Sequence, residues 1–340
     1  MNPSDSDEPL PHREHIAMRL LDLESLAAGE IHHVWLHVAN NGIGEPIRIP
    51  ILVAKGLEPG PTFGITAALH GNELNGISVI QKLFADLDPA HLKGTIVGVL
   101  ALNVPGVLMK QRQFNDNVDL NSIAPGKPAG RGSAVYLHRF IDRVVRQFHY
   151  LIDLHTASVG RVNSLYVRAD MNAPEAARMA RLQVPEIIVH NPPNDTTLRG
   201  SAAALGIPAI TVELRDPSRF QPRTIEDGLA GVLNVLRDLG MLPGLPVFSD
   251  QETILCNGSS WMYTDEGGLL QVFPQVTDMV SKGAPVAEVR TIFGEVTKTF
   301  FCPQDSIVVG RSVDPINQTG SRILHLGRDP RVISCTVEPR

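Results

Sequence analysis

The stretch TFGITAALHGNELNGISVIQKLFADL, from Thr62 to Leu87, contains the elements that decide the fold. Residues 62–69 form an apolar run of strand length, preceded by Gly and Pro, which predicts a buried β-strand. The segment from Glu73 to Leu87 repeats apolar side chains with the spacing of one helix face: Leu74, Ile77, Ile80 and Phe84. His70 and Glu73 are therefore expected on the turn that joins a strand to a helix.

On both sides of this stretch, apolar runs alternate with segments of helical spacing. Strands are predicted over residues 32–40, 46–55, 95–102, 150–154, 186–190 and 208–214. Helices are predicted over residues 135–148, 198–205 and 224–239. This alternation predicts an α/β fold with a mixed, largely parallel sheet flanked by helices.

Changes in composition predict how the chain is divided. Residues 1–14 are polar and acidic, which predicts a disordered tail. A turn-rich sequence, PGLP at 243–246, marks the end of the α/β region, which comprises residues 15–243. Residues 244–340 are rich in Gly, Pro and short Val-rich runs. The second region is expected to form a smaller all-β domain. Residues 113–132 lack periodicity, which favours a functional loop.

Charge and cysteine content exclude several classes of function. The chain has 340 residues, with 30 Lys and Arg against 36 Asp and Glu, so no basic surface is expected for nucleic acid. No segment has the pattern of a signal peptide or the length of a membrane span, which predicts a cytoplasmic protein without a membrane partner. The cysteines fit neither a disulfide framework nor a thiolate zinc site: Cys256, Cys302 and Cys335.

Three candidate metal ligands lie near the ends of predicted strands. His70 and Glu73 follow one strand and His155 ends another, and ligand sites of open α/β sheets lie at the carboxyl ends of strands. Two His and one Glu leave a fourth position for water on a catalytic zinc. Taken singly, each has an ordinary explanation as a solvated helix start or a core histidine. Asp153 is either a carboxylate supporting His155 or a simple strand-end acid.

Two further residues suggest acid–base and electrostatic roles. Glu213 lies at the end of an apolar strand, where an acid is scarce unless it is an exposed terminus or a general base. Arg112, in the loop after the strand 95–102, could place a guanidinium against the oxyanion of a carbonyl under attack by water.

Together these motifs resemble the succinylglutamate desuccinylase/aspartoacylase family, a branch of the zinc carboxypeptidase-like superfamily. The resemblance rests on four runs: GPTFGITAALHGNELNG (60–76), QRQFNDNVDLN (111–121), LIDLHTAS (151–158) and AITVELRDP (209–217). It extends from Pro46 to the C-terminus and implies a zinc carboxypeptidase-like catalytic domain. The run from Ser281 to Gly310 resembles the barrel-sandwich module behind that domain, with a hairpin tip at 292–294 and no lysine to modify.

The resemblance implies a role for each matching residue. His70, Glu73 and His155 would bind one Zn²⁺ per chain. Glu213 would be the general base, Arg112 would polarise the scissile carbonyl, and Asn121 would position the substrate.

Two positions depart from the family pattern. Ser122 stands where the family usually has the arginine that clamps a substrate carboxylate, which argues against a carboxypeptidase. Arg215 stands where the family often has glycine, and it either binds substrate or pairs with Asp216.

The expected function is hydrolysis of the amide bond of a small N-acyl amino acid or related N-acyl amine. A zinc carboxypeptidase acting on peptides and a catalytically silent metal-binding or ligand-binding protein are the alternatives. The expected partner is the small-molecule substrate, and the sequence leaves open whether the chain forms a homo-oligomer.

Overall fold

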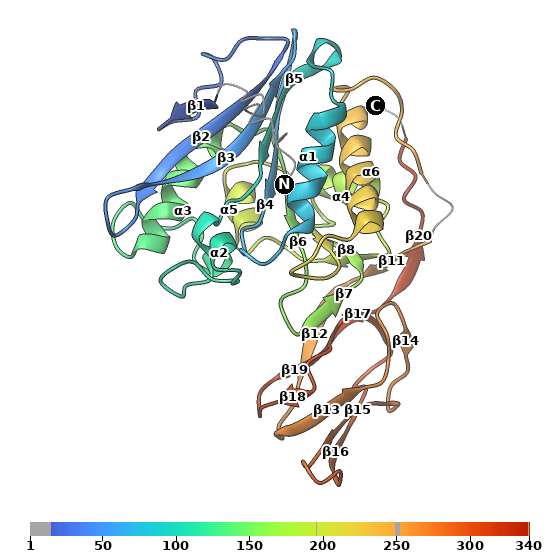
Figure 1. Ribbon diagram of the computed structural model, residues 1–340. Coiled ribbons are helices and arrows are strands. Elements are labelled where there is room, and N and C mark those ends of the chain that lie inside the picture. Colours follow the sequence, from blue (N-terminus) through green and yellow to red (C-terminus); the bar gives the residue numbers. More distant parts are fainter. Residues whose placement is uncertain (1–14, 195, 249–251, 339) are drawn as a thin grey trace, which may run out of the picture.

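A computed structural model describes residues 15–194, 196–248, 252–338 and 340 (Figure 1). The predicted tail, residues 1–14, lies outside the described residues. An 11-stranded sheet runs through the upper lobe in the order β1-β2-β3-β5-β4-β6-β10-β8-β9-β11-β20. Its strands are β1 (His15–Met18), β2 (Glu30–Asn40), β3 (Pro46–Lys55), β4 (Glu58–Ala67), β5 (Lys93–Val99), β6 (Tyr150–His155), β8 (Leu165–Ala169), β9 (Ile187–His190), β10 (Ala209–Leu214), β11 (Thr253–Cys256) and β20 (Arg331–Ile333).

Helices cover both faces of this sheet and enclose two apolar cores. On one face α1 (Asn75–Asp86), α4 (Pro174–Leu182) and α6 (Pro222–Asp238) pack over side chains such as Phe63 and Ile152. On the other face α3 (Gly132–Arg143) and α5 (Leu198–Ala204) pack over Leu151 and its neighbours. Successive residues of β6 thus point into opposite cores, as strand geometry requires. The central strands β5, β4, β6 and β10 are parallel, which confirms the predicted fold class.

The C-terminal strands form two antiparallel sheets in a second lobe (Figure 1). One sheet contains β12 (Gly258–Tyr263), β19 (Arg322–Arg328), β17 (Ser306–Ser312) and β14 (Met279–Val280), and the other contains β16 (Val296–Phe301), β15 (Pro285–Arg290), β13 (Gly268–Val272) and β18 (Ile316–Asn317). The described residues from 252 to 338 contain no helix, as their composition predicts. The tip of the β15–β16 hairpin, with Ile292 and Phe293, is exposed.

The two lobes exchange strands. β7 (Arg161–Asn163) leaves the α/β region and pairs with β17, whereas β11 and β20 return to the large sheet from beyond residue 244. The predicted domain boundary between residues 243 and 244 remains a prediction. Strands from both sides of this boundary pair within the same sheets.

The helix predicted over 135–148 begins earlier and ends at Arg143, where a 3-10 turn (Val145–Gln147) follows. The structure also contains β8, α4 and the short α2 (Val104–Leu108), which are not among the predicted elements, because each has few periods over which a pattern can be recognised.

A close backbone approach fixes the turn between β4 and α1. A methyl group at Gly71 would lie 1.9 Å from the carbonyl carbon of Gly106 in α2, so only glycine fits. This contact holds the turn that carries His70 and Glu73 against the segment leading to Arg112.

We predict that Gly71→Ala lowers the free energy of unfolding by about 1–3 kcal/mol, because backbone atoms must move apart to admit the methyl group. Gly42→Ala is the matched control, since nothing lies within 4 Å of that position. Denaturant unfolding of both variants measures the difference. Equal stability of the two variants would contradict the close approach.

Candidate active site

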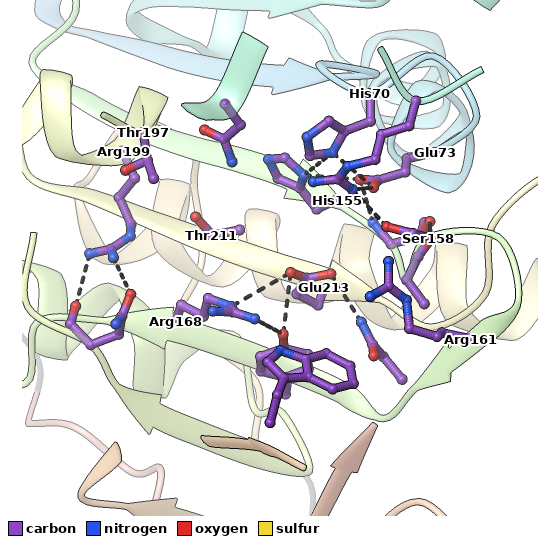
Figure 2. Close-up of a pocket in the computed structure, with 18 of the residues that line it drawn as sticks. His70, Glu73, His155, Ser158, Arg161, Arg168, Thr197, Arg199, Thr211 and Glu213 are labelled. Carbon is purple, nitrogen blue, oxygen red and sulfur yellow. Dashed lines mark hydrogen bonds and ion pairs between the residues drawn. The ribbon is translucent and has the colours of Figure 1, made fainter. Parts of the chain in front are cut away.

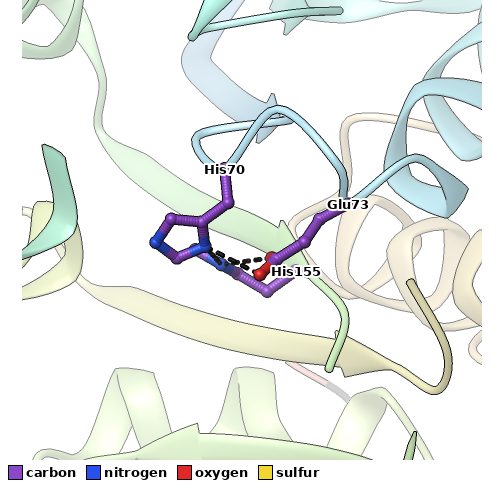
Figure 3. A group of neighbouring side chains, drawn as sticks. All are labelled: His70, Glu73 and His155. Carbon is purple, nitrogen blue, oxygen red and sulfur yellow. Dashed lines mark hydrogen bonds and ion pairs between the residues drawn. The ribbon is translucent and has the colours of Figure 1, made fainter. Parts of the chain in front are cut away.

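The site is built at the carboxyl ends of three adjacent parallel strands. His155 ends β6 and pairs in register with Glu213 of β10, while β4 on the other side of β6 ends at Ala67. The turn after β4 then places His70 and Glu73 beside His155 (Figure 3). These ends of neighbouring parallel strands are where open α/β sheets bind ligands.

The structure brings the three predicted metal ligands together in the interior. One Glu73 oxygen lies 2.8 Å from Nδ1 of His70, and the other lies 2.9 Å from Nδ1 of His155. The two Nδ1 atoms are 3.2 Å apart, and all three residues are at most 3% exposed. Burial raises the pKa of Glu73, but the two histidines hold it well below its usual range. The carboxylate is therefore ionised.

Further polar groups orient these side chains. Asp153 accepts a hydrogen bond from Nε2 of His155 at 2.7 Å and another from the hydroxyl of Thr66 at 2.6 Å. The backbone N–H of Thr156 donates to Glu73 at 3.0 Å. Because Asp153 holds Nε2, the Nδ1 atom of His155 faces Glu73 and His70. Burial lowers the pKa of His155, but Asp153 and Glu73 raise it well above the usual value, so the site favours positive charge.

Arg112 links this group to the long loop that follows α2. Its guanidinium donates to Glu73 at 3.0 Å, to Asp119 at 3.0 Å and to the hydroxyl of Ser158 at 2.7 Å. Asp119 also lies 3.1 Å from Nε2 of His70. The loop over residues 113–132 is thus anchored to the site through Asp119.

Glu213 lies across from the three ligands in a polar setting. It accepts hydrogen bonds from Asn163 at 3.2 Å and Tyr166 at 3.3 Å, and Arg168 is 3.7 Å away (Figure 2). Burial raises the pKa of Glu213 and Arg168 opposes that rise. A carboxyl group with a raised pKa can accept and return a proton near neutral pH.

A cavity of about 190 Å³ joins these groups. It is lined by carboxylates of Glu73 and Glu213 and by an excess of guanidinium groups: Arg112, Arg161, Arg168, Arg199 and Arg322. Sequence reasoning identified only the first of these arginines. Tyr166 and Arg168 are two residues apart and therefore share one face of β8, which could have indicated a polar strand face at the site. A strand as short as β8, however, shows no clear alternating pattern.

The two predicted substrate-binding residues lie in different places. Asn121 lines the cavity, and its side-chain oxygen accepts a hydrogen bond from the backbone N–H of Leu198 at 2.9 Å. Arg215 is not among the lining residues. It pairs with Glu186 at 2.7 Å rather than with Asp216, and its φ of 57° is the left-handed conformation that glycine adopts most readily. The structure therefore does not bring Arg215 to the other site residues.

The donor set fits a divalent metal ion. One atom from each of His70, Glu73 and His155 can be chosen so that all lie within 4.8 Å of one another. Two imidazoles and a carboxylate are characteristic ligands of catalytic zinc, and a carboxylate hydrogen-bonded to a ligating histidine usually accompanies them. The buried cysteines are free and none lines the cavity: Cys256, Cys302 and Cys335.

Sequence comparison finds relatives among deacylating enzymes. A family model described as succinylglutamate desuccinylase/aspartoacylase catalytic domain matches residues 59–239. The chain is 23% identical over 280 residues to N-alpha-acetyl-L-2,4-diaminobutyric acid deacetylase of Halomonas elongata, covering 78% of this chain and 81% of the relative. It is 27% identical over 166 residues to succinylglutamate desuccinylase of Pseudomonas paraeruginosa, covering 44% and 49%.

Solved structures share the fold. A succinylglutamate desuccinylase/aspartoacylase from Rhodobacter sphaeroides superposes with a TM-score of 0.79 at 21% identity, covering 88% of this chain and 96% of that chain. The product-bound ectoine utilization protein of Ruegeria pomeroyi superposes with a TM-score of 0.81 at 19% identity, covering 88% and 95%. No helix among the described residues is long and apolar enough to cross a membrane.

We predict that Asp153→Asn weakens zinc binding by about 10–100-fold, because the amide supports the His155 imidazole less well than a carboxylate does. Competition with a chelator of known affinity measures the effect. Asp142→Asn, which alters an exposed ion pair with Arg146, is the control. Unchanged affinity in Asp153→Asn would contradict a supporting role for this carboxylate.

Proposed function

The chain belongs to the succinylglutamate desuccinylase/aspartoacylase family, and on that premise we propose that it is a zinc-dependent amidohydrolase of small N-acyl amino acids. The products would be a carboxylic acid and a free amine. One observation carries this proposal: the buried group of His70, Glu73 and His155 shares a cavity with Glu213, which stands beside His155 on the next strand.

His70, Glu73 and His155 would hold the zinc ion. Zinc bound there would act as a Lewis acid that lowers the pKa of a water molecule and polarises the substrate carbonyl. Asp153 keeps His155 oriented for that task, and Arg112 and the N–H of Thr156 keep Glu73 oriented.

Glu213 would act as the general base. Its raised pKa suits a carboxylate that takes a proton from the attacking water and then gives it to the departing nitrogen. Asn163 and Tyr166 donate to its two oxygens and hold the carboxylate in place. Arg112 would face the oxygen of the carbonyl under attack and stabilise its developing negative charge.

The amino-acid carboxylate would bind where Asn121 and Arg199 line the cavity. Ser122 cannot provide a cation, and its hydroxyl donates back to the carbonyl of Asp119 at 2.7 Å. Arg199 is 4% exposed and donates to the backbone and side-chain oxygens of Asn191, which are neutral. Burial and then Arg168 lower the pKa of Arg199 to about 10, so its charge remains at neutral pH. A carboxylate would neutralise this buried charge.

The proposal is tested by incubating the purified protein, before and after removal of metal, with N-acetyl and N-succinyl amino acids, their carboxamides and dipeptides. We expect zinc-dependent release of free amino acid from the N-acyl compounds and preference for carboxylates over carboxamides. Hydrolysis of the dipeptides alone would contradict the proposal, and hydrolysis that persists without metal would contradict its zinc dependence.

We predict that Glu213→Gln retains zinc but lowers kcat by about 10²–10⁴-fold, because the amide cannot take a proton from water. Metal analysis and kinetics on the same preparation separate the two effects. A variant with normal turnover would remove Glu213 from the mechanism.

We also predict a change in pH dependence. The pKa of Glu213 is raised by burial and held down by Arg168, and the base must be ionised to work. Arg168→Gln should therefore move the acid limb of the kcat/KM profile to higher pH. Arg146→Gln, at an exposed ion pair, should leave the profile unchanged. A shift to lower pH in Arg168→Gln would contradict this electrostatic relation.

A further inference from the structure

Another cavity lies where β1, β2 and α3 meet, at the edge of the large sheet (Figure 1). It has a volume of about 440 Å³ and shares no lining residue with the catalytic cavity. Its wall consists of three arginines and a short segment of β2: Arg19, Arg139, Arg143 and residues 37–40. A cavity of this size can hold a small molecule.

The backbone at the edge of the sheet fixes two of these arginines in place. β1 ends at residue 18, and β2 continues beyond it without a neighbouring strand on that side. Arg143 of α3 donates to the carbonyl oxygen of His37 at 3.3 Å and to that of Arg19 at 3.0 Å. Arg139 donates to the carbonyl oxygen of Val38 at 2.9 Å. Each guanidinium uses only Nη1 for these bonds, so Nε and Nη2 are available to another acceptor.

The three arginines have no acidic partner in the part of the chain that the structure describes. Arg139 and Arg143 are four residues apart on α3, a spacing at which like charges destabilise a helix. Asp142 is exposed and pairs with Arg146. Burial and then Arg139 lower the pKa of Arg143, Asp142 opposes this effect, and Arg19 lowers the pKa further. A bound anion would relieve the repulsion among these cations.

The free donors match a phosphate group. A phosphate group carries about two negative charges and has strong acceptor oxygens, which guanidinium groups bind through paired hydrogen bonds. A purely structural role, in which the arginines close the open edge of β2, accounts only for the bonds of Arg139 and Arg143. Arg19 is exposed, and its side chain makes no hydrogen bond to the described residues. A bound anion gives a role to this third cation in the cavity wall.

We propose that Arg19, Arg139 and Arg143 form a binding site for the phosphate group of a small molecule. The site is separate from the catalytic cavity and does not depend on the proposed hydrolysis. Arg19 follows β1, whereas the other two arginines belong to α3, so a bound phosphate would connect the edge strand to the helix that packs beneath it. A ligand that binds only the folded chain also raises its stability.

Isothermal titration calorimetry at constant ionic strength tests the site with two probes, inorganic phosphate and ribose 5-phosphate. We expect both to bind. Arg19→Gln should weaken their binding about tenfold or more, because a charge-assisted hydrogen bond is lost. Tighter binding of ribose 5-phosphate would identify a phosphate ester as the preferred ligand, and tighter binding of inorganic phosphate would identify the free anion. Either result supports the site.

Charge, position and folding need separate controls. Arg19→Lys should recover part of the lost affinity, because it keeps the positive charge. Arg331→Gln removes the same charge from an exposed position on β20, at the opposite edge of the sheet, and it should leave phosphate binding unchanged. Arg19→Gln breaks no side-chain hydrogen bond to the described residues, so the variant should fold normally, as circular dichroism can verify.

The catalytic cavity also contains arginines, so a variant there separates the two sites. Arg199→Gln should retain the phosphate binding that depends on Arg19. Binding that survives Arg19→Gln but is lost in Arg199→Gln would place the anion in the catalytic cavity and overturn the proposal. Absence of binding to the wild type, or equal affinity in the wild type and Arg19→Gln, would also overturn it. None of these results depends on amide hydrolysis, so the proposed function is tested separately.

Discussion

A carboxylate buried between two imidazoles sets the requirements for the rest of the site. Glu73 is 1% exposed, so its ionised form needs compensation in an environment where a lone charge is strongly destabilising. His70, His155, Arg112 and the Thr156 N–H provide it, and they come from three separate segments. The sheet must hold β4 and β6 in register for this group to exist, and Gly71 must allow the intervening turn to approach α2. A divalent cation bound by His70, Glu73 and His155 would compensate the same carboxylate directly.

Much of this arrangement could be predicted because it follows from local pattern and strand direction. His155 and Glu213 end apolar runs, and the carboxyl ends of parallel strands meet at one edge of a sheet. His70 and Glu73 follow from the strand-to-helix pattern around them. Sequence reasoning could therefore place the predicted ligands and base together without knowing the full topology.

The remaining residues of the cavity depend on long-range packing that leaves no local pattern. Trp261 and Arg322 are distant in sequence from the metal ligands, and they reach the cavity because β7 crosses to pair with β17. Nothing in the sequence around Arg199 indicates a functional role, because it lies in a short helix. Its burial beside Asn191 becomes evident only in the structure. The sequence likewise does not indicate that β11 and β20 join the large sheet. A change in composition marks where the second lobe begins, but it does not show which later strands pair with the first lobe.

Under the proposed function, each region of the chain would have a distinct part in one reaction. The sheet edge would supply the metal ligands and the base, the loop with Arg112 would supply the group that faces the oxyanion, and the surrounding arginines would favour anionic substrates. The second lobe also contributes to the cavity, because its side chains Trp261 and Arg322 line part of the wall.

X-ray absorption at the zinc edge, recorded on protein purified in the presence of zinc, distinguishes a histidine and glutamate site from a cysteine site. We expect one zinc per chain with nitrogen and oxygen ligands only, including the multiple-scattering pattern of two imidazoles. A zinc ion coordinated by sulfur would place the metal at the cysteines instead. That result, or a protein that retains no zinc, would contradict a metal centre at His70, Glu73 and His155.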